Sequence, residues 1–314
     1  MMRIKKFIKL LQRNLEFRMN VDNKINTTLF GLDNYYKKLN SLMEQKKFPK
    51  VFLLTGDKGI GKNTLIAHIL NRYLKGPKGQ SYEKEFFFDN YISNNLNNIF
   101  YFSAETDNLK IDKIREIRAL LQKSNINNQK RFIIFDDIEL LNINSINALL
   151  KIIEEPSDTN NFILINNKSK PLIDTIRSRC IELKLFIQND ERIEIIDNLL
   201  RQRNITSEIP YKEYPVSPGN ALNYTKLCKE KKININDKLS LNVEKLINLY
   251  KKEKNYLFIR LSIFLINQFY VTKIIKTDNT NLFQERNETI KKVLNISSFN
   301  LNNKNILYDL KNIV

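Results

Sequence analysis

The sequence predicts an α/β domain with a doubly wound parallel sheet, followed by an all-helical region. Between about residues 29 and 185, short apolar stretches alternate with helical patterns, which is typical of parallel sheets with helices on both faces. Beyond that point the apolar residues recur at helical spacing. We expect a basic N-terminal extension over 1–20, the α/β domain over 21–185, and two helical domains over 186–235 and 236–314.

The chain is strongly basic. It has 52 Lys and Arg against 34 Asp and Glu, a net charge of +18 over 314 residues. Such an excess favours contact with polyanions, nucleic acid first, through counterion release. A biased composition rich in Asn, Lys and Ile would give the same charge, so the charge alone does not decide between these readings.

Cysteine and histidine are scarce. Cys180, Cys228 and His68 are the whole supply, which excludes a disulfide framework and a Cys/His zinc site of the usual spacing. We therefore expect no bound metal of that kind and a reducing, cytoplasmic setting.

We expect no membrane span and no signal peptide. The longest apolar run, 256–271, is interrupted by Arg260, Asn267 and Gln268. Residues 1–20 are basic and amphipathic, without the apolar segment and cleavage site of a signal peptide. We expect these residues to form a basic surface helix. The alternative is that the translation start is assigned too early and that Met19 is the initiator.

The first strand of the α/β domain leads into a predicted phosphate-binding loop. After a helical pattern over 33–47, the apolar residues 51–54 run into T-G-D-K-G-I-G-K-N-T and then into an apolar helical stripe. Gly56, Gly59 and Gly61 would let backbone N–H groups turn toward a phosphate, and Lys62 would add a positive charge. The alternative is a glycine turn in an ordinary βα unit.

One position departs from the phosphate-loop pattern. A hydroxyl should follow the lysine as a magnesium ligand, but Asn63 stands there and Thr64 comes one place late. Because an amide oxygen is a poorer ligand in that register, we expect weak nucleotide binding and impaired hydrolysis. No cofactor is certain from the sequence; ATP or ADP with Mg²⁺, weakly bound, is the one that the loop would hold.

Polar residues follow two later strands. The apolar stretch 132–135 ends in Asp136 and Asp137, and the stretch 162–165 ends in Asn166 and Asn167. Parallel strands present their carboxyl ends at one edge of a sheet, where ligands bind in open α/β folds. We expect Asp136, Asp137 and Asn166 to complete the nucleotide site.

The remaining pattern adds one strand, two irregular stretches and several helices. We expect a strand over 98–102, a variable insertion over 75–96 and a polar loop over 123–131. The predicted helices span 111–121, 144–155, 190–203, 221–227, 239–252, 255–276, 281–294 and 303–314. The long apolar faces of the last four suit packing against partner chains.

Together these motifs resemble the AAA+ clamp-loader subunits of bacterial DNA polymerase III, and within them the delta-prime subunits. The resemblance covers residues 29–222 well and the remainder weakly. Its motifs are L-F-G at 29–31, L-T-G-D-K-G-I-G-K at 54–62, I-D-K-I-R-E-I at 111–117, D-D-I-E-L-L-N at 136–142, N-A-L-L-K-I-I-E-E-P at 147–156, T-I-R-S-R-C at 175–180 and S-P-G-N-A-L at 217–222. It implies an AAA+ P-loop domain, a helical lid over 186–235 and a helical collar over 236–314.

The resemblance also implies a mechanism and partners. In this family an arc of AAA+ subunits binds ATP at its interfaces, opens the ring-shaped sliding clamp and places it around primed DNA. The arginine of the S-R-C motif, here Arg179, would reach a neighbour's nucleotide as an arginine finger; the alternative is a surface arginine near a strand end. The implied partners are gamma/tau and delta subunits in a hetero-oligomer, and through it the clamp and primer–template DNA.

Three departures favour a delta-prime subunit over a motor subunit. A motor should have a hydroxyl after Lys62, a glutamate after the first acid of the strand and an arginine after the Pro-Gly pair. This chain has Asn63, Asp137 and Asn220. All three changes affect hydrolysis in the chain's own site, so we expect weak or no ATPase activity. An active gamma/tau-like ATPase is the alternative, and a P-loop nucleotide kinase is the least favoured reading.

Overall fold

The computed structural model describes residues 25–75, 84–107, 109–121, 130–277, 279 and 281–299. It divides into two compact units, with the boundary between Ile195 and Ile196, and each unit is described by itself. The extension predicted over 1–20 and the helix predicted over 303–314 lie outside the described residues, as does most of the loop at 123–131. The division at 185 and 235 stays a prediction.

The first unit contains a five-stranded parallel sheet in the order β2-β3-β4-β1-β5. The strands are β1 Val51–Thr55, β2 Ile99–Ser103, β3 Arg131–Asp136, β4 Asn160–Asn166 and β5 Ile181–Lys184. Thr55 pairs with Asn166 and Ser103 pairs with Asp136, so the polar ends of these strands align at one edge. The prediction of a parallel α/β sheet is confirmed.

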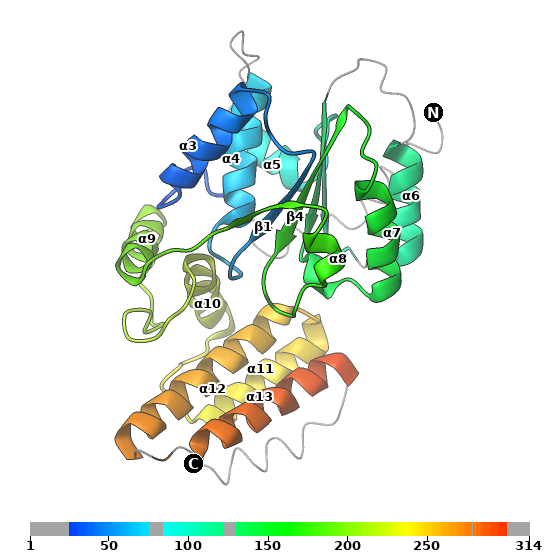
Figure 1. The fold of residues 1–314 in the computed structure, drawn as a ribbon. Helices are drawn as coiled ribbons and strands as arrows, with labels where there is room; N and C mark the ends of the chain where they lie inside the picture. The colour runs from blue at the N-terminus through cyan, green and yellow to red at the C-terminus, as the bar shows by residue number, and fades with distance from the viewer. Residues whose placement is uncertain are drawn as a thin grey trace. The chain divides into compact units, whose positions relative to one another are not determined.

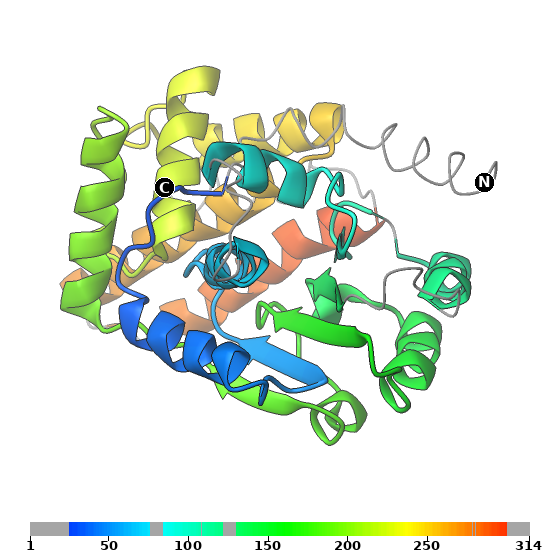
Figure 2. The same ribbon diagram turned by 90° about the horizontal axis from the view of Figure 1, so that it is seen from above.

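Helices cover both faces of the sheet (Figures 1 and 2). One face carries α3 Asp33–Glu44, α4 Lys62–Lys75 and α5 Lys84–Ile92, and the other carries α6 Ile111–Leu121, α7 Ile143–Ile153 and the short α8 Asp174–Arg177. Successive strand residues point to opposite faces: Leu54 packs with the first group and Leu53 with the second, both fully buried. This arrangement makes the sheet doubly wound.

Two elements of this unit differ from the sequence expectation. β5 forms the edge next to β1; it is only four residues long and partly exposed, so its apolar pattern was too weak to indicate a strand. The insertion expected over 75–96 contains α5, which buries Phe87, Phe88 and Tyr91. Its glycine- and asparagine-rich surroundings obscured an aromatic helix that packs beside α4.

The second unit is helical. It contains the second half of α9 Asn189–Gln202, then α10 Pro218–Lys231, α11 Leu239–Glu253, α12 Tyr256–Thr277 and α13 Leu282–Phe299. In Figure 1, α12 runs beside α11 and α13, and the three share one core in which Val243, Leu261 and Val293 are fully buried. The apolar faces that we expected to meet partner chains therefore pack largely against one another.

Among the described helices, α12 is the one that is long and apolar enough to cross a membrane by length and composition. Its large side chains Phe258, Leu261, Ile266 and Tyr270 are fully buried among the neighbouring helices. This packing is that of the core helix of a helical unit.

The core position of β1 generates a stability prediction. Leu53→Ala should lower the free energy of unfolding by about 2–5 kcal/mol, because it leaves a cavity in a fully buried strand. Ile181→Ala on the edge strand, where the side chain is 63% exposed, should change it by less than about 0.5 kcal/mol. Urea denaturation followed by far-UV circular dichroism measures both, and equal effects would contradict the assigned packing.

Candidate nucleotide site

The predicted phosphate loop connects β1 to α4 in a tight turn. Gly59 and Gly61 have φ angles of +87° and +95°, a region that favours glycine. The backbone N–H of Gly56 donates to the carbonyl of Asn166 at 3.2 Å. A Cβ atom at Gly61 would lie 2.9 Å from Leu32 Cδ1, so the segment after the L-F-G motif packs directly against the loop.

Lys62 begins α4 and is turned back onto the loop. Its Nζ donates to the carbonyl oxygens of Gly56 at 2.7 Å and of Asp57 at 2.8 Å. The side chain is buried, and burial lowers the pKa of its ammonium group to about 8, while the carboxylates of Asp136 and Glu139 act in the opposite direction. Lys62 must give up these two hydrogen bonds before it can reach a phosphate.

The amide that replaces the expected hydroxyl has a protein partner. Asn63 Oδ1 accepts a hydrogen bond from the hydroxyl of Tyr91 at 2.8 Å. Tyr91 lies fully buried in α5, the helix that the sequence did not indicate. The next residue, Thr64, is half-buried on α4. The oxygen that would face a magnesium ion is therefore directed toward a buried tyrosine.

Asp136, at the end of β3, accepts hydrogen bonds at both carboxylate oxygens. Oδ2 accepts from the Tyr101 hydroxyl at 2.7 Å, and Oδ1 accepts from Asn167 Nδ2 at 2.9 Å and from the Asp137 backbone N–H at 2.8 Å. Burial and then the neighbouring Asp137 carboxylate raise the pKa of Asp136 to about 6. Most of the charge on this carboxylate is present only near and above neutral pH.

Asp137 is buried and has a left-handed backbone with φ of 57° and ψ of 38°. Its carboxylate accepts from Ser103 Oγ at 3.0 Å and from Asn167 Nδ2 at 2.8 Å, and it forms an ion pair with Lys58 Nζ at 2.5 Å. Lys58 also pairs with Glu105. A carboxylate held by three donors in this way is poorly placed to orient a water molecule.

The sequence analysis named Asn166 for the site, but Asn167 is the residue that contacts the acids. Asn166 Oδ1 accepts from the backbone N–H of Lys168 at 3.0 Å, whereas Asn167 Nδ2 bridges Asp136 and Asp137. Neighbouring residues at a strand end point in different directions, and the sequence alone could not choose between them. The participation of Asn166 in nucleotide binding stays a prediction.

Lys58, Tyr101, Ser103 and Glu105 also belong to this hydrogen-bonded group, although the sequence pattern did not indicate them. Tyr101 and Ser103 lie in β2, and Glu105 follows it closely. The rule that gathers polar residues at the carboxyl ends of parallel strands applies to β2 as well as to β3 and β4. Applied to all three strands, it would have found Ser103 and Glu105.

Arg179 lies apart from these contacts, just after α8, and is exposed. Its Nε donates to Glu154 Oε1 at 2.8 Å, and its guanidinium also donates to the carbonyl of Thr175 at 3.0 Å and to Ser178 Oγ at 3.3 Å. Glu154 follows α7, so the arginine is anchored to the helix of the N-A-L-L-K motif. An exposed but tethered guanidinium is available to a ligand from outside the chain.

Cys180 follows the arginine and is partly buried. Burial raises the pKa of its thiol to about 11, so the thiolate is scarce at neutral pH. This fits the packing role that its position suggests.

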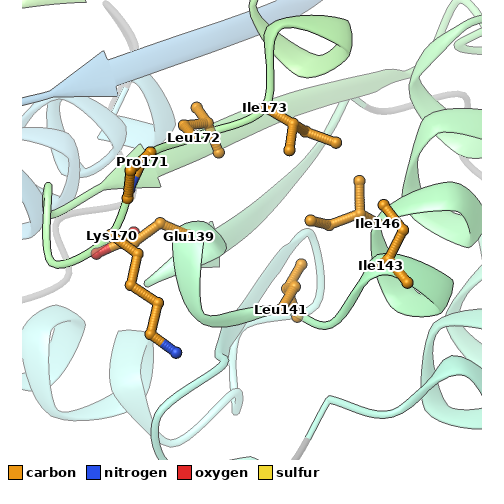
Figure 3. Close-up of a pocket in the computed structure, with 8 residues that line it drawn as sticks. All are labelled: Glu139, Leu141, Ile143, Ile146, Lys170, Pro171, Leu172 and Ile173. Carbon is orange, nitrogen blue, oxygen red and sulfur yellow. The ribbon is translucent and has the colours of Figure 1, made fainter. Parts of the chain in front are cut away.

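A pocket of about 330 Å³ lies beyond the acidic end of β3 (Figure 3). Glu139 and Lys170 lie at one end of it, and isoleucines at the other. Its lining residues are Glu139, Leu141, Ile143, Ile146, Lys170, Pro171, Leu172 and Ile173. They do not include any of the predicted nucleotide-binding residues, so the pocket and the phosphate loop are separate features.

The comparisons with known proteins agree with this arrangement. The sequence family described as "DNA polymerase III, delta subunit" matches residues 31–189, half of the 314-residue chain. The chain belongs to this family. The matched range contains the whole phosphate loop, the acidic strand end and Arg179.

Individual relatives carry the names of several DNA polymerase III subunits. "DNA polymerase III subunit delta'" of Buchnera aphidicola subsp. Schizaphis graminum (strain Sg) is 28% identical over 193 residues, 60% of this chain and 59% of that protein. "DNA polymerase III subunit gamma" of Buchnera aphidicola subsp. Baizongia pistaciae (strain Bp) is 34% identical over 162 residues, 50% of this chain and 43% of that protein. The chain spans about half the length of these relatives.

A solved structure supports the AAA+ fold of this DNA polymerase III family member. A gamma subunit-related protein of Thermotoga maritima superposes with a TM-score of 0.50 at 18% identity, covering 88% of this chain and 97% of that one. At this identity the likeness shows the fold alone. The predicted AAA+ architecture, a P-loop α/β domain followed by helices, is confirmed.

The buried Asp136 generates a pH prediction. Its pKa is raised from an ordinary value near 4 to about 6, so the folded state binds a proton more tightly and stability is lost as pH rises from 4 to 6. Asp136→Asn removes this loss. Relative to the wild type, the variant should gain up to about 3 kcal/mol between pH 4 and pH 7.

Calorimetric unfolding across this pH range measures the difference. Asp158→Asn is the matched control, because its carboxylate is fully exposed and makes only a 3.9 Å surface pair with Lys50. The pH profile of this control should parallel that of the wild type. A parallel profile for Asp136→Asn as well would contradict the raised pKa.

Proposed function

We propose that this chain is a delta-prime-like subunit of the DNA polymerase III clamp loader that supplies Arg179 to a neighbouring subunit's ATP. The observation that carries the proposal is an asymmetry between two parts of one unit. Arg179 is exposed and anchored by Glu154, whereas the groups around the chain's own phosphate loop are engaged with one another. A subunit that donates an arginine finger needs an exposed and anchored arginine. It does not need a phosphate loop that supports hydrolysis.

In this proposal the arginine finger acts on charge that develops during phosphoryl transfer. The Glu154 carboxylate and the Thr175 carbonyl fix the guanidinium through Nε at 2.8 Å and Nη1 at 3.0 Å, and Nη2 of the planar group can then meet a γ-phosphate. Such a finger is worth roughly 10³–10⁵ in rate where it completes a site. The chain would contribute positioning and charge, and the neighbour would contribute the bound nucleotide.

The assembly proposed here is a cytoplasmic hetero-oligomer with gamma/tau and delta subunits that loads the sliding clamp on primed DNA. We assign 21–185 to the AAA+ domain, 186–235 to a lid and 236–314 to an oligomerising collar. Exposed apolar side chains on the tail helices, Ile275 at 77% and Phe283 at 43%, support a surface that another subunit covers. The net charge of +18 suits work near DNA.

A gamma/tau-like ATPase is the second candidate. It is favoured by the relatives named gamma, one of them 34% identical, and by the complete glycine and lysine pattern of the phosphate loop. Against it stand Asn63 and Asp137, whose oxygens already accept hydrogen bonds from Tyr91, Ser103, Asn167 and Lys58.

The finger assignment predicts a defect that appears only in the assembled loader. A complex reconstituted with Arg179→Ala should assemble normally on size exclusion, yet hydrolyse ATP about tenfold more slowly with clamp and primed DNA, since the affected interface loses its finger. Arg177→Ala is the control: this arginine is also exposed and pairs with Asp174 at 3.7 Å. Full turnover by the Arg179 variant would refute the assignment.

The same proposal predicts little activity in isolation. The chain alone should hydrolyse ATP at a rate within about twofold of Lys62→Ala, because its own site lacks a hydroxyl ligand and a properly placed base. Phosphate release measured with Mg²⁺-ATP tests this. Robust turnover that Lys62→Ala abolishes would instead establish the motor function.

A further inference from the structure

We propose that Lys58 is the built-in cation of this site, holding the acidic residues in place of Mg²⁺, so that the chain does not recruit the metal. The inference deepens the proposed function and rests on it, because both concern a phosphate loop that no longer supports hydrolysis. It adds a specific cause. The cation site is filled by a side chain of the loop itself.

The position of Lys58 carries the argument. Its Nζ lies 2.5 Å from Asp137 Oδ1 and 2.5 Å from Glu105 Oε2. The three side chains are 25%, 5% and 18% exposed for Lys58, Asp137 and Glu105, so the group is largely removed from water. A lysine ammonium is a compact point charge with three donors, and here it bridges two carboxylates that follow different strands, Glu105 after β2 and Asp137 after β3.

Other oxygens of the site also accept hydrogen bonds. Asp136 accepts from Tyr101, Asn167 and the Asp137 backbone, and Asn63 Oδ1 accepts from Tyr91. Mg²⁺ needs several oxygen ligands at about 2.0–2.1 Å in a near-octahedral arrangement, and a lone pair that accepts a hydrogen bond is not available to it. The residues that a P-loop family would use for Mg²⁺ therefore do not fit the ion.

The positive charges of Lys58 and Lys62 also disfavour Mg²⁺ at this site. An ion placed beside Asp137 would also lie beside the Lys58 ammonium, and like charges at such short range in a partly buried site repel strongly. Lys62 supplies a second ammonium, held on the loop carbonyls at 2.7 and 2.8 Å. In the described part of the chain, no three His, Cys, Asp or Glu side chains are grouped in a way that could hold a metal ion.

Removal of the Lys58 amine should reverse this situation. Lys58→Met keeps a side chain of similar length but leaves the buried Asp137 without its ion pair, which is costly. A divalent cation can then neutralise Asp137 and Glu105. The variant should bind an ion that the wild type excludes.

The test uses the full chain without nucleotide or partners and Mn²⁺ as the probe. Free Mn²⁺ is counted by electron paramagnetic resonance, and thermal midpoints are measured with and without Mn²⁺ at constant ionic strength. Lys58→Met should bind one Mn²⁺ at least about tenfold more tightly than the wild type and should regain thermal stability in its presence. Lys168→Met is the matched control, because Lys168 forms an exposed 3.3 Å pair with Asp57 at the same loop.

Each outcome decides the proposal. Equal Mn²⁺ binding by folded Lys58→Met and by the wild type would overturn it, as would tight binding by the wild type that Asp137→Asn abolishes. If Lys58→Met does not fold, the wild type decides alone: absence of binding that depends on Asp137 supports the proposal. A negative result for Mn²⁺ binding would not affect the interpretation of the Arg179→Ala experiment, because that experiment measures ATP turnover at another subunit's site.

Discussion

The structure of the first unit depends on how it accommodates buried negative charge at the carboxyl edge of its sheet. Parallel pairing of β2, β3 and β4 brings Ser103, Asp136 and Asn166 to the same edge of the sheet. Glu105, Asp137 and Asn167 follow the ends of these strands. Charges removed from water must be paired or protonated. Lys58 pairs with Asp137 and Glu105. Asp136 accepts hydrogen bonds from Tyr101, Asn167 and the Asp137 backbone, and its pKa is raised to about 6. The phosphate loop is thereby tied to the ends of β2 and β3 by Lys58.

In the proposed function, these ties separate two properties that a motor subunit would combine in one chain. A motor needs open ligand positions beside its phosphate loop and an arginine offered to its neighbour. Here the first set of positions is filled from within, by Tyr91 on Asn63 and by Asn167 across both aspartates. Arg179 remains exposed, and it forms an ion pair with Glu154, the residue that follows α7. The end of the helix that carries the N-A-L-L-K pattern thus holds the exposed guanidinium of Arg179.

Much of this architecture could be read from the sequence, for reasons visible in particular residues. Strands β1, β3 and β4 are continuous apolar stretches, and Gly59 and Gly61 have the positive φ angles that their pattern predicts. The edge strand β5 and helix α5 escaped notice because one is short and half-exposed and the other lies in a polar, glycine-containing stretch. The choice between Asn166 and Asn167, and the partnership of Lys58 with Glu105, depend on side-chain direction at strand ends, which periodicity does not specify.

The burial of α12 has a consequence for how the protein would meet other chains. Its Phe258, Leu261 and Tyr270 are enclosed by helices of the same polypeptide, so the hydrophobic free energy of these three side chains is gained on folding. Association can then join two finished surfaces with little ordering of backbone, which keeps the entropic penalty of docking small.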